Sequence, residues 1–144
     1  MDKYESIKLD NQLCFSLYAT SREVIKLYKP LLDKFNLTYT QYIVMLVLWE
    51  AEKVSVKDIG QKLHLDSGTL TPVIKKLESM QLLIKYRDKE DDRIVIVQLT
   101  TKGAELKDNI LGVPEAIFCK VGGNIEELAM LKNYLDKLLV ELNP

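Results

Sequence analysis

Two short helices with a tight turn between them are predicted over residues 55–79, and this pair constrains the fold more than any other feature. Ser55 is a good N-cap for the first helix. The short apolar face of this first helix is made by Val56, Ile59 and Leu63. Asp66 is the cap that we expect for the second helix, which runs to about Ser79. The inner residues of the second helix are Leu70, Ile74 and Leu77. This spacing predicts a helix-turn-helix.

The second helix has an alternative start. Thr71 followed by Pro72 is also the pattern of an N-cap with proline at the first helical position, which would begin the helix five residues later. We prefer Asp66 as the cap, with Pro72 tolerated early in the helix. Small polar and basic side chains are left on its outer face: Ser67, Thr69, Thr71 and Lys75.

A β-hairpin is predicted directly after this pair of helices. Residues 82–87 and 94–99 are rich in branched and aromatic side chains, which is typical of strands. Residues 88–93 between them are all charged, so we expect an exposed hairpin tip. A two-stranded hairpin in this position is the wing of a winged helix-turn-helix.

Helices are also predicted before the helix-turn-helix. Apolar residues recur at three- and four-residue steps over residues 8–35, which indicates one long helix with a broad buried stripe. Pro30 should bend or split it, because proline lacks the backbone donor and clashes with the preceding turn. Residues 40–50 form a second helix that is apolar nearly all round, so we expect it in the middle of the fold.

The C-terminal region is predicted to be helical as well. One helix should run from Thr100 to about residue 118 with a kink at Pro114, and Gly122-Gly123 should break the chain. The last helix carries leucines spaced 3, 4, 3, 4, as in a coiled-coil seam: Leu128, Leu131, Leu135, Leu138 and Leu142. The terminal helices have more apolar surface than a lone domain of 144 residues can easily bury. We therefore expect a homodimer.

These elements predict a mainly α fold with a small β-hairpin wing. We expect one domain over residues 1–144, in which 1–36 and 101–144 are dimerisation helices and 37–100 are the winged helix-turn-helix module. A module of this type, present twice in a dimer, predicts double-stranded operator DNA as a partner.

Composition narrows the class further. Twenty basic and twenty-one acidic residues give a net charge of −1, so DNA binding must come from the local placement of Lys and Arg. A polar N-terminus and the lack of a long apolar run predict a cytoplasmic protein.

Two cysteines 105 positions apart do not make a disulfide scaffold or a zinc site, and we expect no metal and no cofactor. His64 is the only histidine, and we interpret it as polar surface at a helix end.

Cys14 is the residue with the most reactive chemistry. It lies near the start of a predicted helix, and helix-terminal N–H groups, cations or hydrogen-bond donors stabilise a thiolate. Tyr18 stands one helical turn away and can lie beside it. Cys14 is therefore a candidate redox sensor. A buried cysteine that packs as a small hydrophobe is the commoner alternative.

The order of elements resembles the MarR family of winged-helix transcription regulators, from about Leu9 to Leu142. The acid-x-arginine wing tip (Asp91, Arg93) and the exit Leu99-Thr100-Thr101-Lys102-Gly103 carry the resemblance. Three further segments are similar to the branch of organic-hydroperoxide-sensing repressors known as OhrR: residues 9–18, 28–34 and 65–72.

The resemblance implies roles for particular residues. In that branch an N-terminal cysteine is oxidised by an organic hydroperoxide, and two tyrosines of the other subunit hold its sulfur, which would map onto Cys14, Tyr28 and Tyr39. Cys14 and Tyr28 are fourteen residues apart, about 21 Å along one helix, so any contact between them should join two subunits. Cys119 stands where some members carry a second cysteine. The hypothesis is that oxidised Cys14 forms an intersubunit disulfide with Cys119. The alternatives are that Cys119 is a helix-end cysteine with no partner, or that Cys14 pairs with a small thiol.

The same resemblance implies a DNA contact surface. Asp66 at the start of the recognition helix belongs to this surface. Ser67, Thr69 and Thr71 suit base edges and phosphates, while Lys75 and Lys76 supply charge to the backbone. Arg93, braced by Asp91, is the minor-groove candidate. Lys85 and Arg87 lie nearby for phosphates. Outside this context, the lysines would be interpreted as an ordinary solvated face.

Two other functions compete. A MarR-type repressor that responds to a small aromatic acid would leave Cys14 with only a packing role. A thiol peroxidase would use Cys14 as its peroxidatic residue, but the sequence lacks a Thr/Pro-x-x-x-Cys context and a nearby arginine to activate the peroxide. We therefore expect a regulator rather than an enzyme.

Overall fold

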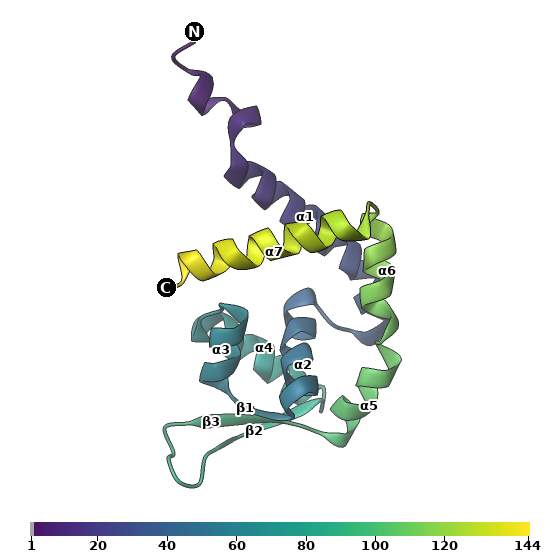
Figure 1. Cartoon of the computed structure of the whole chain (residues 1–144). Helices are drawn as coiled ribbons and strands as arrows, with labels where there is room; N and C mark the ends of the chain where they lie inside the picture. The colour runs from purple at the N-terminus through teal and green to yellow at the C-terminus, as the bar shows by residue number, and fades with distance from the viewer. Residues whose placement is uncertain (1) are drawn as a thin grey trace.

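The computed structural model describes residues 2–144, which form seven helices, three short strands and three 3-10 turns. The N-terminal elements are η1 (Glu5–Ile7), η2 (Leu9–Asn11), α1 (Leu13–Leu32) and η3 (Asp33–Phe35). The central elements are α2 (Tyr39–Ala51), β1 (Lys53–Ser55), α3 (Val56–Leu63), α4 (Ser67–Ser79), β2 (Leu83–Arg87) and β3 (Val95–Leu99). The C-terminal helices are α5 (Thr101–Asn109), α6 (Gly112–Val121) and α7 (Ile125–Leu142). The prediction of a mainly helical winged fold is confirmed (Figure 1).

The helix-turn-helix forms with the expected caps. Ser55 accepts a hydrogen bond from the backbone N–H of Asp58 at 3.1 Å, and Asp66 accepts one from Thr69 at 2.7 Å. The chain turns between α3 and α4 at His64, which is exposed and left-handed with φ 56°. Asp66 is therefore the cap of α4, and Pro72 lies inside the helix.

The wing contains one strand more than expected. Its antiparallel sheet has the order β1-β3-β2, and β1 pairs with β3 through Lys53↔Gln98, Val54↔Val97 and Ser55↔Ile96. A three-residue strand is too short to show alternation in a sequence, and Ser55 is also the cap of α3. The hairpin of β2 and β3 is confirmed.

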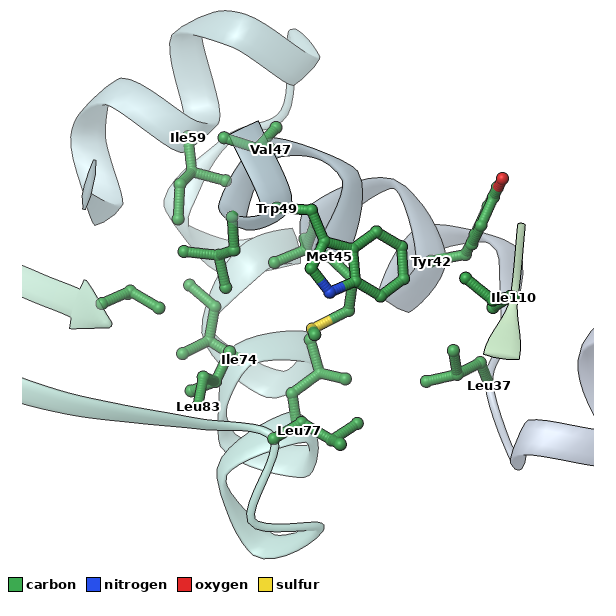
Figure 2. Packing of buried hydrophobic residues seen from close by; sticks show 14 of the residues in the cluster. Leu37, Tyr42, Met45, Val47, Trp49, Ile59, Ile74, Leu77, Leu83 and Ile110 are labelled. Atoms are coloured by element: carbon green, nitrogen blue, oxygen red, sulfur yellow. The ribbon is translucent and has the colours of Figure 1, made fainter. Parts of the chain in front are cut away.

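The core surrounds α2, as its apolar sequence predicts. Met45 and Leu48 are fully buried there, and side chains from α3, α4 and the sheet pack against them (Figure 2). The α2 N-terminus is fixed by a capping box between Thr38 and Gln41. The helix-turn-helix and the wing therefore share one core.

The N-terminal helix differs from the prediction at both ends. It begins at Leu13 rather than residue 8, because Gln12 is extended and its side-chain amide donates to the carbonyls of Ser6 and Lys8 at 2.8 Å. The helix continues through Pro30 to Leu32 and then changes to the 3-10 turn η3. Of the two outcomes expected at Pro30, a bend or a split, the split does not occur.

The predicted helix from Thr100 to residue 118 is also wrong as a single element. It consists of α5 and α6, with a break at Ile110 and Leu111, before Pro114. Proline has no N–H to donate to the carbonyl four residues earlier. The carbonyl of Ile110 accepts from the N–H of Val113 at 3.1 Å instead. The break at Gly122 and Gly123 is confirmed, with φ of 72° and 88°.

The terminal helices extend beyond the central module. In Figure 1, the first half of α1 and the turns before it point away from the other elements, and α7 returns from the end of α6. The helix α6 packs against α1. Within residues 2–144, no helix is long and apolar enough to span a membrane.

Candidate functional site

The outer face of α4 presents the small polar side chains that the sequence predicted. Ser67, Thr69 and Thr71 are all exposed, and the hydroxyl of Thr71 donates to the carbonyl of Ser67 at 2.7 Å. Asp66 has a different role from theirs. Hydrogen bonds from Thr69 lower the pKa of its carboxyl group, so Asp66 is an ionised helix cap at neutral pH. Lys75 and Lys76 are exposed further along α4.

The wing tip holds an arginine in a fixed orientation. Arg93 donates from Nε to Oδ1 of Asp91 and from Nη2 to Oδ2, each at 2.9 Å. This pairing raises the pKa of Arg93 and lowers that of Asp91. Arg93 remains largely exposed, with 87% of its side chain accessible. The expected brace is present, and it leaves the outer part of the guanidinium free for an anionic partner.

The other basic residues of the wing are held by different contacts. Arg87 donates to the backbone carbonyl of Asp92 at 2.7 Å, which stabilises the hairpin tip. The backbone N–H of Lys85 donates to the carboxylate of Glu78 at 3.2 Å and so links β2 to α4. Both side chains are exposed on the same strand.

A groove between the wing and α3 adds basic residues that the sequence reasoning missed. It is about 2080 Å³ in volume, and Ser67 and Arg93 line it. Three lysines from the neighbouring elements line it too: Lys53, Lys57 and Lys62. Lys53 lies on the undetected strand β1, while Lys57 and Lys62 lie on α3, where lysines on an amphipathic helix carry no specific signal alone. Asp58, Asp88 and Asp91 line the same groove, so its lining is of mixed charge.

Cys14 is the second residue of α1 and is exposed. The N-cap residue Gln12 makes no side-chain hydrogen bond to the first turn, so the N–H groups of that turn keep their partial positive charge. Tyr18, one turn further on, is exposed, and its hydroxyl accepts from Arg22 at 3.3 Å. Cys14 therefore lies at a helix N-terminus and is open to solvent.

Tyr28 and Tyr39 lie together, in a cluster that also contains Tyr42. The ring centroids of Tyr28 and Tyr39 are 4.7 Å apart, and those of Tyr28 and Tyr42 are 5.9 Å apart. Burial, with the neighbouring hydroxyls adding to it, raises the pKa of Tyr28 to about 12, and burial also raises the pKa of Tyr39 and Tyr42. All three phenols are therefore protonated hydrogen-bond donors at neutral pH. Tyr42 was missed, although its i+3 spacing from Tyr39 places both on one face of α2.

One chain does not bring these tyrosines to Cys14. The helix α1 is unbroken from Leu13 to Leu32, so Cys14 and Tyr28 are separated by about 21 Å along its axis. Cys119 is exposed on α6, and neither cysteine forms a disulfide. Among residues 2–144, no cluster of three His, Cys, Asp or Glu side chains could hold a metal ion.

A helix-turn-helix followed by a wing with an exposed arginine at its tip, flanked by exposed apolar helices, is the arrangement of a winged-helix DNA-binding regulator. The family model described as transcriptional regulator SarA/Rot matches residues 26–110. The organic hydroperoxide resistance transcriptional regulator of Bacillus subtilis (strain 168) is 48% identical over 99% of this chain and 97% of its own length. The chain belongs to the MarR/SarA family of winged-helix transcriptional regulators, and it is a regulator rather than an enzyme.

Solved structures agree with this membership. The structure of reduced AbfR bound to DNA matches with a TM-score of 0.84 and 33% identity, covering 99% of this chain and all of that one. The structure of disulfide-formed AbfR matches with a TM-score of 0.67 and 36% identity, over 92% of this chain and 96% of that one. AbfR is a protein of Staphylococcus epidermidis.

Proposed function

We propose that this protein is a redox-sensing transcriptional repressor. The reduced homodimer binds operator DNA, and an organic hydroperoxide releases it by oxidising Cys14. The observation that carries this proposal is an exposed cysteine at the N-terminus of α1, in a chain 48% identical over 99% of its length to a regulator of organic hydroperoxide resistance. Such a repressor would act in the cytoplasm, where the DNA is.

The DNA interface consists of α4 and the wing of each subunit. The helix α4 enters the major groove, where Ser67, Thr69 and Thr71 reach base edges or phosphates. The basic residues Lys75, Lys76, Lys85 and Arg87 contact the phosphate backbone, and Arg93 enters the minor groove. The relative AbfR has been solved bound to DNA in the reduced state, which supports this interface.

The homodimer interface is formed by the terminal helices, in segments 1–36 and 101–144. The helix α7 has no buried residue, although it carries the leucine seam. Leu13 on α1 is 71% exposed, and Leu131 on α7 is 49% exposed. Exposed apolar surface of this extent marks an interaction site. A second copy would cover these faces and bring Tyr28 and Tyr39 of one subunit to Cys14 of the other.

The chemistry at Cys14 follows from its thiolate. The sulfur attacks the terminal oxygen of the hydroperoxide, an S–O bond forms as the O–O bond breaks, and the alkoxide takes a proton and leaves as an alcohol. The product is a sulfenic acid, to which the phenols of Tyr28 and Tyr39 would donate hydrogen bonds. The sulfur of Cys119 in the partner subunit then attacks the sulfenic sulfur, an S–S bond forms as the S–O bond breaks, and the leaving hydroxide takes the thiol proton and departs as water. A disulfide-formed structure exists for AbfR, which supports this step.

DNA affinity measured before and after oxidation tests the proposal. Fluorescence anisotropy would follow a duplex from the upstream region of the gene as one equivalent of cumene hydroperoxide is added to the reduced protein. We expect loss of binding in the wild type and no loss in Cys14→Ser. Unchanged binding in the wild type would contradict oxidation sensing and favour a repressor that responds to a small aromatic ligand.

The variant Cys119→Ser distinguishes the two oxidised forms, which are the sulfenic acid on Cys14 and the intersubunit disulfide. On a non-reducing gel, oxidised wild type should run as a covalent dimer, and Cys119→Ser should run as a monomer. A monomer band from oxidised wild type would rule out the intersubunit disulfide and leave the sulfenic acid as the signal.

A further inference from the structure

The C-terminal end of α4 is tied to the start of α5. After α4 the chain turns through Gln81, which is left-handed with φ 64°. The hydroxyl of Thr100 donates to the carbonyl of Gln81 at 2.7 Å, and the ammonium of Lys102 donates to the carbonyl of Met80 at 3.0 Å. The backbone N–H of Thr100 donates to the carbonyl of Leu82 at 3.2 Å. We call this set of contacts, between residues 80–82 and 100–102, the α4–α5 joint.

The joint is also fixed from the side of α2. The indole N–H of Trp49 donates to the carbonyl of Gly103 at 2.9 Å, in a buried position (Figure 2 shows Trp49 in the core). A Cβ atom added at Gly103 would lie 2.1 Å from the carbonyl oxygen of Leu82, so the two backbones touch. The start of α5 therefore packs directly against the turn that follows α4.

The joint lies on the path between the cysteines and the DNA. The helix α5 continues into α6, which carries Cys119 and packs against α1, the helix of Cys14. A continuous stretch of chain therefore runs from Cys119 on α6 through α5 to the joint. Coupling of this kind requires an element that both sites move.

We propose that Lys102 is a positioning residue that makes the recognition helix α4 move with α5 when the cysteines are oxidised. The inference rests on the proposed function, because it assumes that oxidation changes DNA affinity. The Lys102 ammonium lies at the C-terminal end of α4, where the helix dipole is negative, and a hydrogen bond from a charged donor is stronger than a neutral one.

Lys102 can be altered without damage to the core. It is exposed, and it borders an open hollow of about 780 Å³ that Lys34 and Lys76 also line. Thr100 is unsuitable for such a test, because its hydroxyl also caps α5 by accepting from the N–H of Gly103. Lys102→Met removes the ammonium and keeps an unbranched side chain.

Lys107→Met is the matched control. Lys107 lies on the same helix and donates to the carbonyl of Trp49 at 3.4 Å, so it ties α5 to α2 but not to α4. Both variants remove one positive charge from α5. Trp49 is the only tryptophan, so an unchanged emission maximum shows that the joint remains folded in each variant.

The first readout is the ratio of oxidised to reduced Kd for a duplex from the upstream region of the gene. We expect Lys102→Met to lower this ratio about tenfold, a size usual for coupling between sites, and Lys107→Met to keep the wild-type ratio. For reduced Lys102→Met, the slope of the logarithm of the DNA binding constant against the logarithm of salt concentration should equal the wild-type slope. An unchanged ratio in Lys102→Met overturns the proposal. A slope reduced by about one shows instead that Lys102 contacts a phosphate.

The second readout does not depend on oxidation. On duplexes whose half-sites are moved apart by one base pair, the reduced wild type should lose affinity steeply, because the joint fixes α4 to α5 within each subunit and the proposed dimer interface fixes the subunits to each other. Lys102→Met should lose several-fold less affinity than the wild type. An equal loss in both overturns the proposal. If wild-type binding did not respond to oxidation, the proposed function would fail while the half-site result still tested the joint.

Discussion

The central module and the terminal helices differ in what becomes of their apolar side chains. Most of the buried apolar residues described in the structure lie between Leu37 and Val97, whereas no residue of α7 is buried. Met45 and Leu48 of α2 are fully covered within one chain, but Val140 and Leu142 of α7 are 70% and 69% exposed. Both regions contain long helices, although all three strands lie in the central module. A periodic apolar pattern therefore specifies a helix. Whether the apolar face of that helix is buried depends on which other elements of the chain can pack against it.

The largest expected effect comes from the terminal helices. Leu135→Glu places a carboxylate in the middle of the α7 seam, where Leu135 is 38% exposed in one chain. Burial of this charge in a dimer should cost about 3 kcal/mol or more, which weakens dimerisation roughly 100-fold. Analytical ultracentrifugation should show monomers at micromolar concentration, and DNA binding should fall with them.

Lys137→Glu is the control for this change, because it reverses a charge on the exposed side of the same helix. It should leave the dimer intact. A Leu135→Glu protein that still sediments as a dimer would show that α7 is not part of the interface, and the contrast between the two regions would then need another explanation.

A smaller effect is expected where the module meets α5. Gly103→Ala would force a Cβ atom against the carbonyl of Leu82, at 2.1 Å in the present geometry. The backbones must separate, so we expect the free energy of unfolding to fall by about 3 kcal/mol in urea denaturation at a fixed protein concentration.

Gly112→Ala provides the matched comparison. A Cβ atom at Gly112, the first residue of α6, meets nothing within 4 Å. This variant should be neutral or more stable by up to about 1 kcal/mol. Equal losses in both variants would show that α5 is not packed more tightly than α6.

The smallest effect concerns Tyr28, at the boundary between the regions. Its pKa is raised from 10.0 to about 12 in the folded chain, chiefly by burial. Between these values the folded state retains a proton that the unfolded state releases, so the free energy of unfolding should decrease as pH rises from about 10 to 12. Tyr28→Phe removes this contribution, and denaturation at several pH values should show a flatter decrease. The same slope in both proteins would assign the effect to Tyr39 and Tyr42.

Much of the fold could be predicted because its signals are local. Ser55 and Asp66 cap their helices as expected, and the charged run at residues 88–93 forms the tip of the wing. The brace between Asp91 and Arg93 spans two residues and was also predictable. The strand β1 was missed because its partner, β3, lies more than forty residues away in the chain. The early end of α5 was missed because Pro114 acts on the carbonyl of Ile110, which precedes it.

The sequence alone determined the helix-turn-helix with its caps Ser55 and Asp66, the hairpin of β2 and β3 and the presence of a cysteine near a helix start, since each depends on residues close together in the chain. The division into 1–36, 37–100 and 101–144 stays a prediction. Only the tertiary structure placed Tyr28, Tyr39 and Tyr42 in one cluster and set Lys102 against the end of α4. These contacts join residues up to 22 positions apart, and a periodic pattern does not record which faces meet when helices pack.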